Sequence, residues 1–174
     1  MANIGHPETS EYASAFANYV ANVSEDDVLA AMEAQSRETA ALLARVDEEK
    51  GSYRYGPEKW SVKEVVGHFT DAERVFAYRA LAIARGDQAS LPGFDENEYM
   101  RHSNFDQRSM RSIADEYATA RAATLAEFRG FSDEAWQRRG TANNNPVSVR
   151  ALARICLGHE RHHLRVLRER YGLS

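Results

Sequence analysis

Proline occurs at only four positions, and long proline-free stretches lie between them. The prolines are Pro7, Pro57, Pro92 and Pro146. The intervening stretches are rich in Ala, Leu, Glu and Arg, which are residues that favour helix. No stretch has the apolar–polar alternation that is typical of a strand. The sequence therefore predicts an all-α fold.

Four of these stretches carry apolar residues at helical spacing. We expect helices over about residues 24–47, 61–86, 109–129 and 148–170. Amphipathic helices of this kind bury their apolar faces by packing against each other, so the pattern predicts a four-helix bundle. The connection over residues 87–107 is too long for a simple helical hairpin and predicts a crossover between the second and third helices.

A shorter helical segment, about residues 12–20, precedes the four long ones. The length of 174 residues fits a single domain with or without a tail. We therefore expect an N-terminal extension with a short helix, residues 1–23, followed by one bundle domain, residues 24–174.

The cysteine count and the charge exclude several classes of protein. One cysteine cannot form an internal disulfide framework or a cysteine-rich zinc site. The formal net charge of -4 argues against binding of nucleic acid through the overall charge of the chain. No apolar run approaches the roughly 20 residues that cross a bilayer, and the first residues do not resemble a signal peptide. We expect a cytoplasmic protein that binds neither nucleic acid nor membrane.

Three histidines lie close together in the fourth predicted helix. His159 and His163 are four residues apart and differ by only about 40° around a helix, so both rings can converge on one point. His162 is three residues from His159, and spacing alone does not exclude it. The apolar face of the helix distinguishes His163 from His162. His163 lies within the arc of apolar residues, whereas His162 lies at the margin of that arc, about −60° from His159. We expect His163 to face the bundle interior and His162 to face outward.

His68 brings a further imidazole to the apolar face of the second predicted helix. Three neutral imidazoles are a sufficient ligand set for Zn²⁺, Ni²⁺ or Fe²⁺ and leave positions open for water or substrate. An ion held there would polarise a water, a thiol or a carbonyl. The competing interpretation is that His68, His159 and His163 are core residues satisfied by hydrogen bonds, because a His-x-x-x-His pair also arises by chance.

Two motifs together resemble a known family. The first is Lys-Trp-Ser-Val-Lys-Glu-Val-Val-Gly-His over residues 59–68, followed by Asp-Ala-Glu-Arg over residues 71–74. The second is Gly-His-Glu-Arg-His-His over residues 158–163. They resemble the metal-histidine motifs of the DinB/YfiT-like superfamily, and the resemblance covers about residues 11–171. It implies a four-helix bundle with a crossover connection and a divalent metal on His68, His159 and His163.

The same resemblance carries expectations about function. Members of the family include metal-dependent hydrolases and transferases that act on low-molecular-weight thiols such as bacillithiol, mycothiol or glutathione, and many are dimers. We therefore expect a homodimeric enzyme for a small-molecule substrate that uses zinc or nickel, with iron or manganese as further options. The alternative is a metal-binding stress-response module without turnover. The sequence identifies no general base.

Four further residues have two interpretations each. Cys156 fits a small buried core residue better than a fourth metal ligand. Asp71 either orients a histidine ring or is a solvated charge, and Glu160, about 100° from its neighbour His159, has the same two options. Arg79 is either a buried ion-pair partner or an anchor for an anionic substrate. We favour the structural role for Arg79, because it lies roughly 16 Å from His68 along the helix.

The remaining candidates lie near helix ends and loops. Trp60 and Trp136 are expected to pack over the bundle, although either could line a pocket. The amide-rich loop over residues 141–145 could add polar contacts at the open end of a site, but turn conformations explain its composition equally well. His6 and His102 are expected at the surface.

Overall fold

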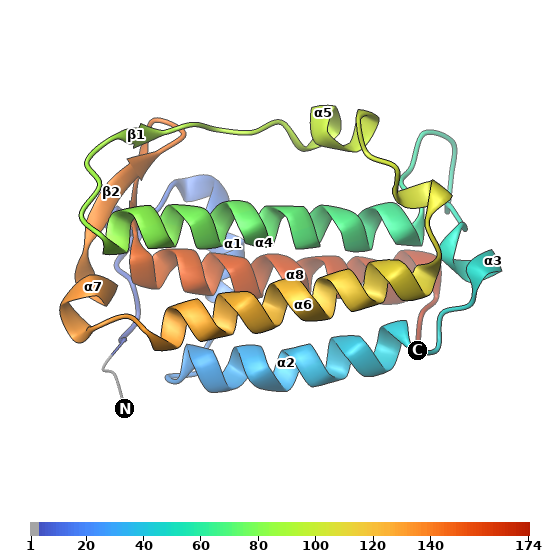
Figure 1. Ribbon diagram of the computed structural model, residues 1–174, viewed down its shortest axis with the longest axis horizontal. Helices are drawn as coiled ribbons and strands as arrows, with labels where there is room; N and C mark the ends of the chain where they lie inside the picture. Colours follow the sequence, from blue (N-terminus) through green and yellow to red (C-terminus); the bar gives the residue numbers. More distant parts are fainter. Residues whose placement is uncertain (1–3) are drawn as a thin grey trace.

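Four long helices lie side by side in the computed structural model, which describes residues 4–174 (Figure 1). They are α2 (Val28–Leu43), α4 (Val62–Ala84), α6 (Met110–Arg129) and α8 (Val149–Tyr171). The shorter helices are α1 (Ala17–Ala21), α3 (Glu48–Gly51), α5 (Glu96–Arg101) and α7 (Asp133–Gln137), with 3₁₀ turns at Thr9–Glu11, Ser14–Phe16 and Phe105–Gln107. None of the described helices is long and apolar enough to cross a membrane.

The connection between α4 and α6 determines the topology of the bundle. α4 packs against α6 and α8, and α2 packs against the same two helices. In Figure 1, α4 and α6 run in the same direction, because the chain between them returns along the whole length of the bundle. The predicted four-helix bundle with a crossover between its second and third long helices is confirmed.

Three of the long helices begin where the sequence predicts. Ser61, Ser109 and Ser148 each precede a helix, and each hydroxyl accepts a hydrogen bond from a backbone N–H in the first turn. At α4 the Glu64 carboxylate completes a capping box by accepting from the Ser61 N–H at 2.8 Å. At the other end of α4, Gly86 adopts a φ of 86°, which ends the helix.

The first long helix is shorter than expected. The prediction over residues 24–47 was wrong at both ends, because α2 has 16 residues and α3 is a separate element. The Asp27 carboxylate, rather than Ser24, accepts from a backbone N–H of α2. The Asp47 carboxylate does the same for α3 at 2.8 Å, so it starts a new helix instead of ending the first.

A small sheet adds to the helices and makes the expectation of a chain without strands incomplete. β1 (Ser90–Leu91) pairs in parallel with β2 (Arg139–Ala142), which forms an antiparallel hairpin with β3 (Asn145–Ser148). Asn143 and Asn144 connect the hairpin with φ values of 50° and 59°. Two asparagines at positive φ make the tight turn that such a hairpin needs. Strands of two to four residues are too short to show alternation in the sequence.

The apolar core forms two clusters, one toward each end of the bundle. Buried polar side chains lie between the clusters, on all four long helices. We refer to them as the polar layer: Gln35, Thr39, His68, Thr70, Glu73, Arg121, Thr124, His159 and Glu160. The layer contains a set of hydrogen-bonded ion pairs and two histidines, whereas Thr70 and Thr124 donate to carbonyl oxygens of their own helices.

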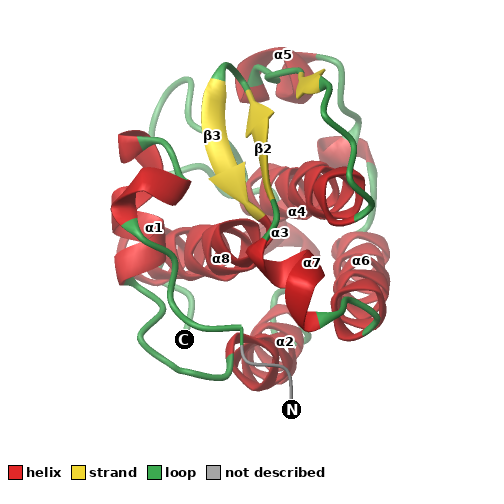
Figure 2. Ribbon diagram, turned by 90° about the vertical axis from the view of Figure 1, so that its left-hand side faces the viewer, coloured by secondary structure: helices red, strands yellow, loops and turns green. Residues whose placement is uncertain are grey.

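The N-terminal segment lies against α8, as Figure 2 shows for α1. Gly158 makes this contact possible, because a β-carbon there would lie 2.0 Å from the carbonyl oxygen of Tyr19. Glu11 anchors the start of the segment through a hydrogen bond of 2.8 Å from Arg150. The division of the chain into residues 1–23 and 24–174 stays a prediction.

Candidate metal centre

Three histidines from two helices meet at the polar layer. α4 contributes His68, and α8 contributes His159 and His163 from successive turns. The Nε2 atom of His159 lies 3.2 Å from Nε2 of His68 and 3.1 Å from Nε2 of His163. Ligand atoms of the three residues all lie within 4.8 Å of one another. We refer to this group as the histidine cluster.

The spacing of the nitrogens fits a shared metal ion. Two imidazole nitrogens about 2.1 Å from one ion, at tetrahedral or octahedral angles, lie about 3.0–3.4 Å from each other. The two Nε2 separations at His159 fall in that range. A neutral imidazole carries only one N–H, so three converging nitrogens cannot satisfy each other with protons alone. The histidine cluster could therefore hold a divalent cation.

Burial keeps these imidazoles in the form that binds metals. Loss of solvent lowers the pKa of His68 from 6.5 to about 4 and the pKa of His159 to about 3. The pKa of His163 is also lowered, by burial and by the adjacent rings of His159 and His68. All three rings are therefore neutral near pH 7, and each offers a lone pair rather than a proton.

Aromatic rings surround the histidine cluster and hold its orientation. The Trp60 ring lies 4.9 Å from that of His68, and the Tyr19 and Phe76 rings lie 5.3 and 5.7 Å from that of His159. Both contacts with His159 are edge-on, a favourable geometry for aromatic pairs. Trp60 thus lies beside the candidate ligands, whereas Trp136 packs against Phe128 in the core.

His162 lies outside the histidine cluster. Its Nδ1 atom is 3.3 Å from the guanidinium of Arg165, and its ring packs at 5.5 Å from Tyr19 on the outer side of α8. The structure thus separates His163 from His162 in the way that the apolar face of the helix predicts. His102 is exposed, and His6 lies near Asp26, also away from the cluster.

The histidine cluster opens into a cavity of about 380 Å³, which we call the histidine cavity. Its walls come from α1, α4, α8, the crossover and the β2–β3 hairpin. Most of the lining is apolar or aromatic, and the polar exceptions are few. Asn143 and Asn145 of the predicted amide-rich loop do line it. The volume suits a small molecule.

Glu96 is a lining residue that sequence analysis did not single out. It lies at the start of α5 in the crossover, and it is the acidic member among the lining residues described. Burial and then the charge of Glu96 raise the pKa of Tyr19, and the same charge opposes the lowering of the pKa of His68 by burial. Nothing in the sequence around residue 96 distinguishes it from a solvated helix start.

Arg79 also lines the histidine cavity. Its side chain is buried, and one guanidinium nitrogen donates to the carbonyl oxygen of Pro92 at 2.7 Å. Across residues 4–174 no carboxylate lies within ion-pair distance of it. The ion-pair interpretation favoured from the sequence was therefore wrong.

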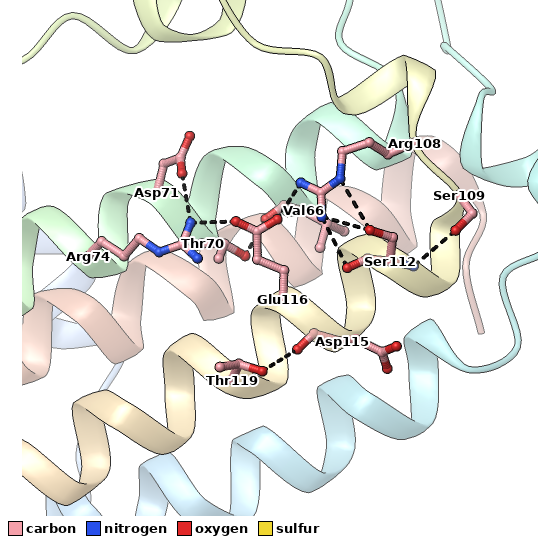
Figure 3. A network of polar contacts seen from close by, with 10 residues as sticks. All are labelled: Val66, Thr70, Asp71, Arg74, Arg108, Ser109, Ser112, Asp115, Glu116 and Thr119. Atoms are coloured by element: carbon pink, nitrogen blue, oxygen red, sulfur yellow. Dashed lines mark hydrogen bonds and ion pairs between the residues drawn. The ribbon is translucent and has the colours of Figure 1, made fainter.

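Asp71 does not contact a histidine of the cluster. Figure 3 shows it on the outer side of α4, where Arg74 lies between Asp71 and Glu116 of α6. Arg108 binds the other oxygen of Glu116. Burial raises the pKa of Asp71, and the charge of Arg74 opposes this effect. Asp71 therefore belongs to an ion-pair group that joins α4 and α6.

Glu160 is buried rather than solvated. Its carboxylate accepts hydrogen bonds from Thr39 at 2.6 Å, Tyr117 at 2.7 Å and Arg121 at 2.6 Å. Arg121 also pairs with Glu73 at 2.8 Å. These contacts link all four long helices beside the histidine cluster. The interpretation of Glu160 as a solvent-facing charge was wrong.

Cys156 lies in the apolar core one turn before His159. Its side chain is buried, and it is not among the grouped candidate ligands. Burial raises the pKa of the thiol, which disfavours the thiolate that a metal would need. The structural role predicted for Cys156 agrees with this position.

The chain matches a family model and is similar in fold to solved structures. The model of the DinB superfamily matches residues 31–167, which is well over half of the sequence. The chain belongs to the DinB superfamily. A search of curated proteins finds no match.

One solved structure of similar fold is YfiT from Bacillus subtilis, described as a probable metal-dependent hydrolase with an unusual four-helix bundle topology. The match has a TM-score of 0.69 and covers 99% of each chain at 16% sequence identity. At this identity the likeness establishes the fold, and the chain is a DinB/YfiT-like protein with a buried group of three histidines.

Proposed function

We propose that this protein is a divalent-metal-dependent enzyme that acts on a small molecule, by hydrolysis or by transfer of a low-molecular-weight thiol. One observation carries the proposal: the three converging Nε2 atoms border an open cavity instead of packing into a closed core. A structural metal site is usually closed by four protein ligands, whereas a catalytic site keeps a position free. The description of YfiT as a probable metal-dependent hydrolase supports the same reading.

In this proposal His68, His159 and His163 hold the ion through Nε2. A divalent ion bound there supplies Lewis acidity to a thiol, water or carbonyl that enters the cavity. An all-imidazole set suits zinc or nickel, and iron or manganese are further options. The aromatic walls around the cluster exclude bulk water and hold the body of the substrate.

Glu96 is the proposed proton acceptor. A thiol or water loses a proton when it attacks, and the acceptor must lie within reach of the reacting group. Among the described lining residues Glu96 carries the carboxylate, and its charge acts on His68 and Tyr19. Replacing Glu96 by Gln should lower turnover and leave metal content unchanged.

Elemental analysis of protein purified without a histidine tag tests the metal site. We expect about one ion per chain in the wild type, and its loss in His68→Ala, His159→Ala and His163→Ala. His162→Ala is the matched control on the same helix and should keep the ion, because His162 lies outside the cluster. Equal metal content in all four variants would contradict the proposed ligands.

A substrate panel tests the reaction class. The metal-loaded wild type and His159→Ala are assayed side by side. Transfer is tested with bacillithiol, mycothiol or glutathione and a model electrophile. Hydrolysis is tested with esters and amides. Turnover that requires His159 supports an enzyme. Bound metal without turnover on any of these substrates would favour the non-catalytic stress-response module.

A homodimer stays a prediction, which light scattering on the purified protein tests.

A further inference from the structure

Arg79 is a buried cation that the metal chemistry does not use. It is only 5% exposed, and of its five N–H donors the structure accounts for one, through Pro92. Its guanidinium carbon also lies 5.9 Å from the centre of the Phe94 ring. Burial without a counter-charge lowers the pKa of Arg79, which reflects the unfavourable environment of the charge.

Two other buried arginines have more partners than Arg79. Arg121 binds two carboxylates, Glu73 and Glu160. Arg154 donates through its two terminal nitrogens to several backbone carbonyls, including those of Val23 and Glu25, and its Nε has no partner within residues 4–174. In the described part of the chain Arg79 has a single hydrogen bond and lines the histidine cavity, and an under-paired buried charge is unfavourable, so its position indicates a partner that enters from the cavity.

Arg79 and His68 lie on the same face of α4. They are eleven residues apart, which corresponds to about 20° of rotation and roughly 16 Å along the axis. Side chains on a helix lean toward its N-terminus, so Arg79 leans toward the histidine end. Both residues line the histidine cavity, and Phe76 lies between them.

The cavity wall carries charges of both signs. Glu96 is the acidic residue among the lining residues described, and Arg79, whose guanidinium carbon lies 5.9 Å from the centre of the Phe94 ring, is the cation. The aromatic rings of Phe16, Phe76 and Phe94 contribute to the apolar wall. An anion that enters the cavity is therefore attracted by Arg79 and repelled by Glu96.

We propose that Arg79 anchors the carboxylate of a small substrate whose apolar body lies along the aromatic wall and whose reacting end reaches the histidine cluster. A guanidinium presents paired N–H donors that match the two oxygens of a carboxylate. Arg79 is in this view a substrate-binding residue that selects carboxylic acids. The placement of the reacting end at the histidine cluster rests on the proposed function. The contact between Arg79 and the carboxylate does not require a metal.

Binding to metal-free protein tests the anchor. The probes are 3-phenylpropionate and its neutral amide, which differ at the group that Arg79 would bind, and the readout is titration calorimetry after removal of metal with a chelator. In the wild type the carboxylate should bind about 10- to 100-fold more tightly than the amide. Arg79→Gln should abolish this preference without weakening the amide, and Arg79→Lys should retain part of it.

Arg74→Gln is the matched control. Arg74 is on the same helix, but its guanidinium is paired with Asp71 and Glu116, and it does not line the histidine cavity. This variant should keep the full preference for the carboxylate. Equal binding of the two probes to the wild type, or an equal loss of preference in Arg74→Gln and Arg79→Gln, would overturn the proposal.

Two further measurements keep the result clear. Circular dichroism checks that Arg79→Gln folds. If this variant does not fold, the proposal is judged from the preference of the wild type for the carboxylate over the amide and from the reduction of that preference in Arg79→Lys. Metal content of Arg79→Gln, measured without the probes, should equal that of the wild type. Wild type that lacks metal contradicts the proposed function alone, because the carboxylate preference is measured without metal.

Discussion

Arg121 of α6 and Glu160 of α8 form a buried ion pair of 2.6 Å between the two apolar clusters. Arg121 also binds Glu73 of α4, and Glu160 accepts hydrogen bonds from Tyr117 and from Thr39 of α2. Glu160 directly follows His159 in the sequence. The contacts of Glu160 therefore fix the rotation of α8 that turns His159 toward the cavity.

Loss of the Arg121 charge should destabilise the bundle strongly. Arg121→Met leaves Glu73 and Glu160 buried without a counter-charge, and we expect a loss of about 3–5 kcal/mol in the free energy of unfolding. Urea unfolding followed by circular dichroism measures it. Arg74→Met is the control, because the Arg74 side chain is 48% exposed and its pairs should contribute about 0–1 kcal/mol. Similar losses in both variants would show that burial of the Arg121 pairs is unimportant.

Gly158→Ala should disturb the contact between α1 and α8. The added β-carbon would lie 2.0 Å from the Tyr19 carbonyl oxygen, and that neighbour is backbone that cannot rotate away. We expect a loss of about 1–3 kcal/mol in the free energy of unfolding. Gly56→Ala is the control, since its β-carbon would meet only the Lys59 side chain at 3.6 Å. Unchanged stability of Gly158→Ala would mean that α1 does not pack as described.

The metal-free protein should lose stability as the pH falls from 6.5 toward 4. The folded pKa values of His68 and His159 are about 4 and 3, below the ordinary 6.5, so the unfolded chain binds these protons first. Between pH 6.5 and 4, each of these histidines lowers the free energy of unfolding by up to about 1.4 kcal/mol per pH unit. Above pH 6.5 the rings are neutral in both the folded and the unfolded state, and the folded state keeps its full stability.

Urea unfolding at a series of pH values measures this slope, and comparison with a variant separates it from carboxylate titration. His159→Gln lacks one of the groups, so its stability should fall less steeply between pH 6.5 and 4. His102→Gln is the control, because His102 is exposed. The assignment is wrong if His159→Gln and the wild type have the same slope.

Trp60 should report metal binding by fluorescence. Its ring lies 4.9 Å from His68, close enough for an ion with an open d shell, such as Co²⁺ or Ni²⁺, to quench its emission. Zn²⁺ should quench far less. Trp60→Phe should remove the Co²⁺-dependent change, and Trp136→Phe should keep it, because Trp136 lies in the apolar core. Quenching that persists without Trp60 would place the ion elsewhere.

Local signals in the sequence predicted the helix starts well. Serines at positions 61, 109 and 148 lie directly before long helices and cap them through their own hydroxyls. Asp47 was missed because it lies inside a continuing helical pattern, where only the backbone path reveals that it caps a new helix. The Asn143–Asn144 turn was visible as a polar loop, but its strands are too short for a periodic signal.

Residues placed by long-range packing were harder to predict. A solvated charge was one of two interpretations of Glu160, which is about 100° from His159, yet α8 packs against α1, α2 and α4, so most of the surface of α8 is covered. The family motifs brought His68 to the pair on α8, which spacing alone could not do. Glu96 and the free face of Arg79 depend on the path of the crossover, and no local pattern encodes that path.

The histidine cluster and the rest of the cavity wall have different structural origins. The cluster lies on two rigid helices, whereas Phe94, Glu96, Asn143 and Asn145 come from the crossover and the hairpin. Connecting segments tolerate change far better than packed helices. Substitutions in the crossover and the hairpin can therefore reshape the cavity wall while the two helices that carry the histidine cluster stay unchanged.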